Sequence, residues 1–384
     1  MNKEKALIIL DRCLEFLLYL MIFFMPISKA AIEIIFTLSF FLFVFKKILK
    51  PDFEFLKNPI HFFLLLFFGF CALSLSNSGI YFAKGLKTLF SKWLENILIF
   101  ILVEDTLNTP KRLRNAVSIF LATSVLIGID TIFQQNRGID FLRQRPLVAG
   151  RPTASFENQN SLGTYLIPGT LLAIILIFSQ QLKKQYRYIL FFLAGFLSIS
   201  LMLTFSRSAW FGFAVGLFLF LFLSLDIKKA FILICIFIVI LISVPMLRQR
   251  VLHTFVPHGD AQRFALIFST WNMIKDNPFL GKGLGTYMDY FRKYATIPGI
   301  YYAHNDYLQI WAESGIFSLL SFLLFIGSIL YKAIEIFIKN RDILLLGFIC
   351  LMAGFLAHNF FEIQLYSLQL SALFWFMLGL LAAK

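Results

Sequence analysis

The chain has 384 residues, of which 59% are hydrophobic and 15% are charged, and its formal net charge is +14. Soluble domains are nearer to about 45–50% apolar and about 25% charged, so this composition excludes an ordinary soluble protein. A basic soluble chain would suggest nucleic acid. In a chain this apolar, anionic lipid headgroups explain the charge better, and we expect membrane lipids, not nucleic acid, as partners.

Apolar runs long enough to cross a bilayer recur along the whole sequence. About 20 apolar residues in a helix span the roughly 30 Å hydrocarbon core, and a helix satisfies its backbone hydrogen bonds within lipid. The sequence therefore predicts an all-α polytopic membrane protein with about twelve transmembrane helices. The expected spans are 7–25, 30–49, 60–76, 85–103, 115–133, 162–178, 187–205, 208–225, 229–247, 306–331, 343–358 and 363–383.

The N-terminal segment has a basic start and an apolar stretch, as a signal peptide would. No small-x-small cleavage site follows Pro26-Ile27-Ser28, so we expect a retained first helix. The cysteines lie in apolar runs without paired spacing, and neither a disulfide framework nor a zinc site is indicated. They are Cys13, Cys71, Cys235 and Cys350.

Basic turns alternate with apolar spans, which sets an expected orientation under the positive-inside rule. With these turns in the cytoplasm, the segments 134–161, 205–208, 248–303 and 358–362 face outward. The outward side is rich in arginine, which favours bidentate recognition of phosphate or carboxylate. Snorkelling to headgroups is the alternative for any single arginine. The outer arginines are Arg137, Arg143, Arg145, Arg151, Arg207, Arg248, Arg250, Arg263 and Arg292.

The outward loop 248–303 is the one long polar stretch of the chain, and its apolar residues recur at helical spacing. Asp260 is a potential N-cap and Asn277-Pro278 ends the pattern, which predicts an amphipathic helix on the bilayer surface. This helix either covers the bundle or contacts substrate. The stripe consists of Phe264, Ile267, Phe268, Trp271 and Ile274. The following Gly281-Lys282-Gly283-Leu284-Gly285 indicates a tight turn with close backbone approach, not a nucleotide site.

The loop leads into His304-Asn305-Asp306, at the mouth of the next apolar run. Ionisable residues at the edge of a span are costly unless they line a wet cavity. A single histidine is usually structural, but the adjacent amide and carboxylate and the arginine-rich outer surface favour a chemical role. Because imidazole titrates near neutral pH, His304 is suited to accept a proton from a hydroxyl group.

Two other outward turns carry polar groups. Arg207 lies in the short turn Ser206-Arg207-Ser208, and the segment 134–161 ends in Phe156-Glu157-Asn158-Gln159-Asn160. A weaker polar cluster, His358, Asn359 and Glu362, lies at the last outer turn.

These motifs resemble the O-antigen ligase and polymerase superfamily, membrane glycosyltransferases that use polyprenyl-diphosphate-linked glycans. The resemblance covers mainly 150–330. Its most specific part is the pair His304-Asn305, which is followed after nine residues by Gly315. This spacing is similar to the ligase pattern H-[NSQ]-x9-G-x-x-[GTY], although the last position of the pattern is Ser318 here and not Gly, Thr or Tyr. Further family-like motifs are Ser206-Arg207-Ser208-Ala209-Trp210, Arg263 with Trp271, Asn277 to Gly285, and Phe156 to Asn160, where Gln159 replaces the usual proline.

The resemblance implies transfer of a glycan from an undecaprenyl-diphosphate donor to an acceptor, without metal or cofactor. Attack opposite the departing diphosphate would invert the anomeric centre. The acceptor would be lipid-linked, such as lipid A-core oligosaccharide, or a protein, and the site would face the periplasm from the inner membrane. Catalytic roles are expected for His304 and Arg207. Substrate-binding roles are expected for Arg263, Arg151, Arg145, Lys275, Asn305, Asp306 and Tyr307.

The expected organisation is an N-terminal group of transmembrane helices at 1–133 and a catalytic region at 134–384 that includes the loop 248–303. An O-antigen polymerase and a protein (pilin) O-glycan ligase remain alternatives, since they share these motifs. A membrane transporter is a different class, but it would carry charged or broken helices at mid-membrane.

Overall fold

The structure, a computed structural model, describes residues 3–53, 58–224, 227–243, 261–295 and 302–383, together with residues 245, 248 and 249. Within these residues the regular secondary structure is helical, and the extended backbone is limited to two isolated β-bridges. The prediction of an all-α protein is confirmed for this part of the chain. The predicted N-cap Asp260 and Arg250 lie outside the described residues.

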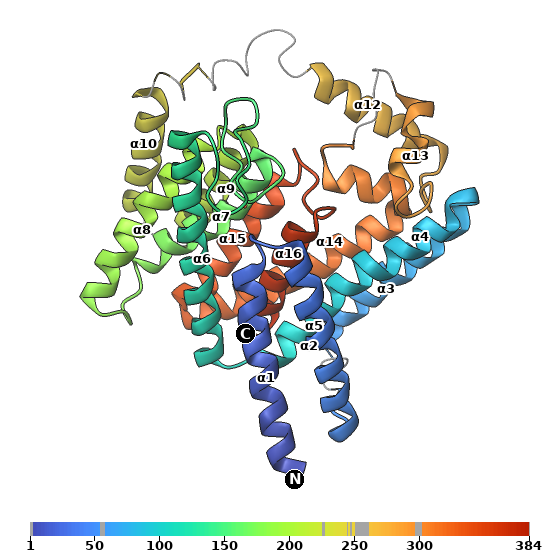
Figure 1. Ribbon diagram of the computed structural model, residues 1–384, viewed down its shortest axis with the longest axis horizontal. Helices are drawn as coiled ribbons and strands as arrows, with labels where there is room; N and C mark the ends of the chain where they lie inside the picture. The colour runs from blue at the N-terminus through green and yellow to red at the C-terminus, as the bar shows by residue number, and fades with distance from the viewer. Residues whose placement is uncertain are drawn as a thin grey trace.

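Figure 1 shows the described helices and labels most of them. They are α1 (Lys3–Phe24), α2 (Lys29–Leu49), α3 (Pro59–Leu73), the 3-10 turns η2 (Ser74–Asn77) and η3 (Gly79–Tyr81), α4 (Phe82–Thr88), the π-helical turn η4 (Leu89–Leu94), α5 (Glu95–Thr106), α6 (Pro110–Arg137), α7 (Gln159–Leu176), α8 (Lys184–Leu203), α9 (Arg207–Ser224), α10 (Ile227–Ser243), α12 (Ala261–Asp276), α13 (Tyr287–Tyr294), α14 (Asp306–Asn340), α15 (Ile343–His358) and α16 (Leu368–Ala382).

Among the described residues, five helical segments are long and apolar enough to cross a membrane. They are Pro59–Asn77, Pro110–Arg137, Lys184–Leu203, Arg207–Ser224 and Asp306–Asn340. Two shorter apolar helices, α15 and α16, accompany them. The chain is thus a helical membrane protein, and the finer expectation of about twelve spans stays a prediction.

The centre of the bundle is made of helices that are apolar on every side. Nearly all residues of α7, α15 and α16 are buried, including the large Trp375. A helix that is hydrophobic all round belongs in such a core. Outer helices expose large apolar side chains instead, for example Phe192 at 73% and Phe222 at 69%, which suits contact with lipid.

Close helix crossings set the positions of the central helices. At the crossing of α9 with α15, a Cβ added to Gly212 would lie 2.6 Å from the carbonyl oxygen of Gly354, and one added to Gly354 would lie 2.8 Å from that of Gly212. Small residues allow membrane helices to approach this closely. This crossing holds the start of α9 beside the end of α15, where the polar residues described below are found.

The two ends of the bundle differ in chemistry. At the end where the chain begins, Lys46 and Lys47 of α2 bind Asp105 of α5 at 2.8 and 2.7 Å. The segment 138–158, α12 and α13 all lie at the opposite end (Figure 1). The polar segments that the sequence assigns to the outward side are therefore together in space.

Several predicted spans differ from the observed helices; α14, for example, continues to Asn340, beyond the predicted end at 331. The span 85–103 is not one α-helix, because the π-helical turn η4 separates α4 from α5. The span 363–383 begins later, at Leu368, because the amides of residues 364 and 365 bond to the buried carboxylate of Asp306 and not to a helical carbonyl.

Candidate active site

The start of α14 is held by its own polar residues. The side-chain oxygen of Asn305 accepts a bond from the Leu308 amide at 2.9 Å, as an N-cap does. The Asn305 amide group donates to the carbonyl of Phe360 at 3.0 Å. Asp306 is fully buried and accepts from the amides of residues 364 and 365 at 2.9 and 3.2 Å. Both side chains thus tie α14 to the segment that follows α15.

Glu362, in that segment, is the centre of the polar cluster. Its Oε1 accepts from Arg263 Nη2 at 2.8 Å and from Asn160 Nδ2 at 2.6 Å, while its Oε2 accepts from His304 Nδ1 at 3.1 Å. The Glu362 side chain is only 6% exposed, whereas those of Arg263 and His304 are 33% and 37% exposed. One buried carboxylate therefore orients a cation and an imidazole that remain accessible. We name Asn160, Arg263, His304 and Glu362 the Glu362 cluster.

The geometry of His304 suits a general base. With Nδ1 donating to Glu362, the imidazole carries its lone pair on Nε2, the atom left for a substrate hydroxyl. A base oriented by a third group is the arrangement used to activate hydroxyl nucleophiles. His304 has a φ of 48°, a left-handed conformation that is uncommon outside glycine and marks local constraint. The cap at Asn305 and the bond to Glu362 hold it there.

Arg207 is the first residue of α9 and is partly buried. Phe211 lies one turn later on the same face of α9, and its ring packs against that of Phe361 with centroids 5.3 Å apart. Phe361 precedes Glu362 in the chain. The contact between Phe211 and Phe361 therefore brings the start of α9 near the segment that carries Glu362, in agreement with the prediction that the 205–208 turn lies near His304.

The segment 138–158 surrounds the start of α7. Asp140 accepts from the backbone amide of Arg145 at 2.7 Å, and the Arg145 guanidinium donates to the carbonyl of Phe156 at 3.3 Å. The guanidinium of Arg151 bonds to the side-chain oxygen of Gln159. Both arginines therefore flank the short stretch that ends at Asn160, the residue that bonds to Glu362.

Lys29 and Glu157 form an ion pair that joins this segment to the start of α2. The hydrogen bond from Lys29 is the main reason that the pKa of the Glu157 carboxyl is lowered. Glu157 is therefore held as a carboxylate by a cation from another helix. It contributes an anchor for the segment and not a proton donor.

The glycine-rich turn docks onto a kink in α14. Gly315 has φ 83° and ψ 172° inside α14, and a Cβ there would lie 1.9 Å from the carbonyl oxygen of Phe279. A Cβ on Gly281 would lie 2.4 Å from the backbone of Glu313. The amides of Lys282 and Gly283 donate to α14 carbonyls at 2.9 Å each. The glycines thus allow two backbones to touch, as the sequence predicts.

Glu313 of α14 stabilises the contact between the glycine-rich turn and α14. Its carboxylate accepts from the amide of Gly285 at 2.9 Å and from the hydroxyl of Tyr366 at 3.2 Å. Burial, followed by the neighbouring carboxylate, raises the pKa of Tyr366 well above its usual value, so it stays a neutral donor. The nine residues between His304-Asn305 and Gly315 therefore form the first part of α14. The imidazole of His304 lies at the start of this part, and the kink at its end holds the glycine-rich turn.

The predicted helix in the outer loop exists as α12, and its predicted apolar stripe is exposed except for the buried Ile274. Phe264, Phe268 and Trp271 are 71%, 56% and 39% exposed, whereas Leu266 and Met273 are almost fully buried. Helix α12 therefore packs on α13 and α14 through one face and leaves a second apolar face uncovered. Its first turn places Arg263 at Glu362.

Seven of the nine predicted site residues fall into three groups; Arg207, at the start of α9, and Lys275 lie outside them. Arg263 and His304 meet at Glu362; Asn305, Asp306 and Tyr307 form the frame, with the Tyr307 hydroxyl donating to the Leu356 carbonyl at 2.8 Å; Arg145 and Arg151 flank Asn160. Lys275 is exposed at the far end of α12 and joins none of these contacts.

Sequence reasoning gave no role to Glu362 or Asn160, although both lie in segments that it noted. The signal for Glu362 is an isolated carboxylate between two apolar spans. Such a group is costly in a membrane protein unless it is paired, and its partner was not visible in the sequence because Arg263 lies 99 residues away.

Residues 189–323 match the O-antigen ligase family model. The match runs from the first part of α8 to the middle of α14 and contains Arg207, Arg263 and His304, whereas Asn160 and Glu362 lie outside it. None of the curated proteins compared with the chain matches it. The matched region, the His304-Asn305-x9-Gly315 pattern and the helical membrane architecture together support the similarity to the O-antigen ligase and polymerase superfamily.

Proposed function

We propose that the protein is an O-antigen ligase-like glycosyltransferase that moves a glycan from undecaprenyl diphosphate to an acceptor hydroxyl. The Glu362 cluster carries this proposal, because it combines an accessible imidazole with an accessible guanidinium on one buried carboxylate. The site faces the periplasm from the inner membrane, in the orientation that the basic turns favour. The acceptor is lipid A-core oligosaccharide.

In the reaction, the acceptor oxygen attacks the anomeric carbon and transfers its proton to His304 Nε2. The bond from the anomeric carbon to the diphosphate oxygen breaks, and its electron pair stays on the diphosphate. Attack opposite the departing group inverts the anomeric centre. Fixed cations that face the departing diphosphate stabilise the charge that develops there, and Arg207 and Arg263 have this role, with Arg151 and Arg145 beside the path.

Ligase activity is favoured over polymerase activity by the His304-Asn305-x9-Gly315 pattern. The polymerase and the protein O-glycan ligase differ from it in the acceptor, a second glycan or a pilin hydroxyl. The same cluster would serve all three reactions, so the acceptor must be identified by assay. A transporter is disfavoured, because the Glu362 cluster lies at the end of its helices and not at mid-membrane.

The test supplies purified full-length protein with a polyprenyl-diphosphate glycan and, in separate reactions, lipid A-core, a second lipid-linked glycan, or a pilin. We expect transfer to lipid A-core and loss of transfer in His304→Ala at unchanged membrane abundance. Transfer that persists in His304→Ala removes His304 from the mechanism. Transfer only to the second glycan or the pilin replaces the ligase with one of the alternatives.

A further inference from the structure

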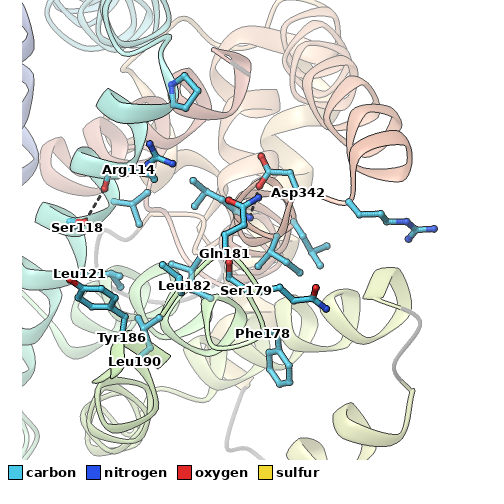
Figure 2. A pocket seen from close by; sticks show the side chains of 18 of the residues that line it. Arg114, Ser118, Leu121, Phe178, Ser179, Gln181, Leu182, Tyr186, Leu190 and Asp342 are labelled. Atoms are coloured by element: carbon cyan, nitrogen blue, oxygen red, sulfur yellow. Dashed lines mark hydrogen bonds between the residues drawn. The ribbon is translucent and has the colours of Figure 1, made fainter. Parts of the chain in front are cut away.

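A large cavity lies at the opposite end of the bundle from the Glu362 cluster. Its volume is about 820 Å³, within the range of about 300–1,000 Å³ that is typical of small-molecule sites. Figure 2 shows side chains from the α7–α8 connection and from α6 and α8 around it, together with Asp342 before α15. This cavity is therefore separate from the proposed transfer site.

The helices that line the cavity show where it lies relative to the Glu362 cluster. Three helices connect the cavity with the opposite end of the bundle. Helix α6 lines the cavity with Arg114 near its start and ends at segment 138–158. Helices α9 and α14 start at Arg207 and beside His304, and they line the cavity with Ser224 and Phe337 near their ends. Since α9 has 18 residues, the two sites are about 27 Å apart along the helix axes. This is close to the roughly 30 Å hydrocarbon thickness, so the cavity lies at the other membrane interface.

The wall of the cavity is mostly apolar. It is lined by Val117, Leu121, Leu176, Leu182, Leu190 and Leu346. Tyr186 and Ile189, also in the lining, are 49% and 53% exposed on α8. Tyrosine is enriched at membrane interfaces, and the exposed apolar surface of α8 continues into the wall. The cavity therefore borders a surface that faces lipid.

Two arginines stand at the cavity. Arg114 and Arg341 both line it and are exposed, and neither forms an ion pair within the part of the chain that the structure describes. Arg341 keeps its guanidinium carbon 5.6 Å from the ring centre of Phe337. The one acidic lining residue, Asp342, accepts from the amides of Leu344 and Leu345 and caps α15. The cavity thus offers two guanidinium groups to an anion.

We propose that this cavity binds an anionic phospholipid of the adjacent leaflet, with an acyl chain against the apolar wall and the phosphate at Arg114 and Arg341. Basic pockets between transmembrane helices on the cytoplasmic side are suited to anionic headgroups, and arginine binds phosphate bidentately. A polar small molecule would leave the apolar wall of the cavity without an apolar group to contact, and an apolar protein segment would leave the two arginines without an anion. A phospholipid matches both.

The experiment measures lipid retained by the full-length protein in detergent, by native mass spectrometry, with phosphatidylglycerol or phosphatidylcholine as the probe. Three variants are compared with wild type: Arg114→Gln/Arg341→Gln, which removes both charges; Ser118→Trp, which fills the cavity without changing charge; and Lys111→Gln/Lys332→Gln, a control that removes two exposed charges outside the lining. Ser118 is exposed, and its hydroxyl bonds only to the Arg114 carbonyl of its own helix (Figure 2).

We expect wild type to retain phosphatidylglycerol over phosphatidylcholine. Retention should fall about tenfold in the arginine variant and in Ser118→Trp, and stay unchanged in the lysine control. Equal retention by all variants overturns the proposal, as does an equal loss in the lysine control, which would mean diffuse surface attraction. Displacement of the lipid by millimolar inorganic phosphate alone would show an anion site without a lipid and also overturn it.

Discussion

Replacing Glu362 with glutamine tests the proposed mechanism at its centre. The amide is nearly isosteric with the carboxylate, and its oxygen can still accept from Arg263 and Asn160, which lie 2.8 and 2.6 Å from Oε1. Its nitrogen then faces His304 Nδ1, where Oε2 now accepts at 3.1 Å. Because an amide nitrogen only donates, Nδ1 must become the acceptor, and the proton moves to Nε2.

The magnitude follows from the role of the base. General base catalysis contributes about 10²–10⁴-fold, and a histidine held in the wrong tautomer loses a comparable factor in other enzymes. We expect the maximal transfer rate of Glu362→Gln to fall about 10²–10⁴-fold, or about 3–5 kcal/mol in the barrier. The KM for the donor should change little, because Arg263 keeps its position. Loss of one charged hydrogen bond should cost about 1–3 kcal/mol of stability.

The assay is steady-state transfer kinetics with the purified variant, with thermal unfolding as the control for folding. Glu362→Ala serves as the comparison, because it removes all three bonds and should lower stability as well as rate. A Glu362→Gln rate within about threefold of wild type, less than about 1 kcal/mol, would refute the reasoning and leave Glu362 as a purely structural residue. A large rise in KM at unchanged maximal rate would place Glu362 in donor binding instead.

Three further predictions concern other parts of the site. Arg207→Lys keeps the charge but loses the planar fork, so we expect about a tenfold lower rate; wild-type kinetics would favour simple headgroup contact. Gly315→Ala should lower stability by about 3 kcal/mol or more and abolish transfer, because its Cβ would meet the Phe279 carbonyl at 1.9 Å and its φ is 83°. Gly327→Ala, where nothing lies within 4 Å, is the matched control, and equal loss in both would refute the kink argument. A cysteine at Lys275 should react with an impermeant reagent outside intact spheroplasts; labelling only after lysis would invert the proposed orientation.

The class of the protein could be read from the sequence because it depends on local properties. Long apolar runs predict helices wherever they occur, since a helix satisfies its own backbone. The boundaries were harder to predict. Helix α16 starts at Leu368, after the predicted residue 363, because Asp306, 58 residues away from Gln364, captures the intervening amides. No local pattern contains that contact.

The sequence by itself determined the helical membrane class, the resemblance to the O-antigen ligase and polymerase superfamily, and the candidate residues His304, Arg207 and Arg263, because hydropathy and short motifs are properties of neighbouring residues. Only the tertiary structure decided that Glu362 joins Asn160, Arg263 and His304. Those bonds span 202, 99 and 58 residues, and they exist only because the starts of α7, α12 and α14 lie beside the end of α15. The physical reason is that a buried carboxylate needs cationic or donor partners, and packing alone determines which ones reach it.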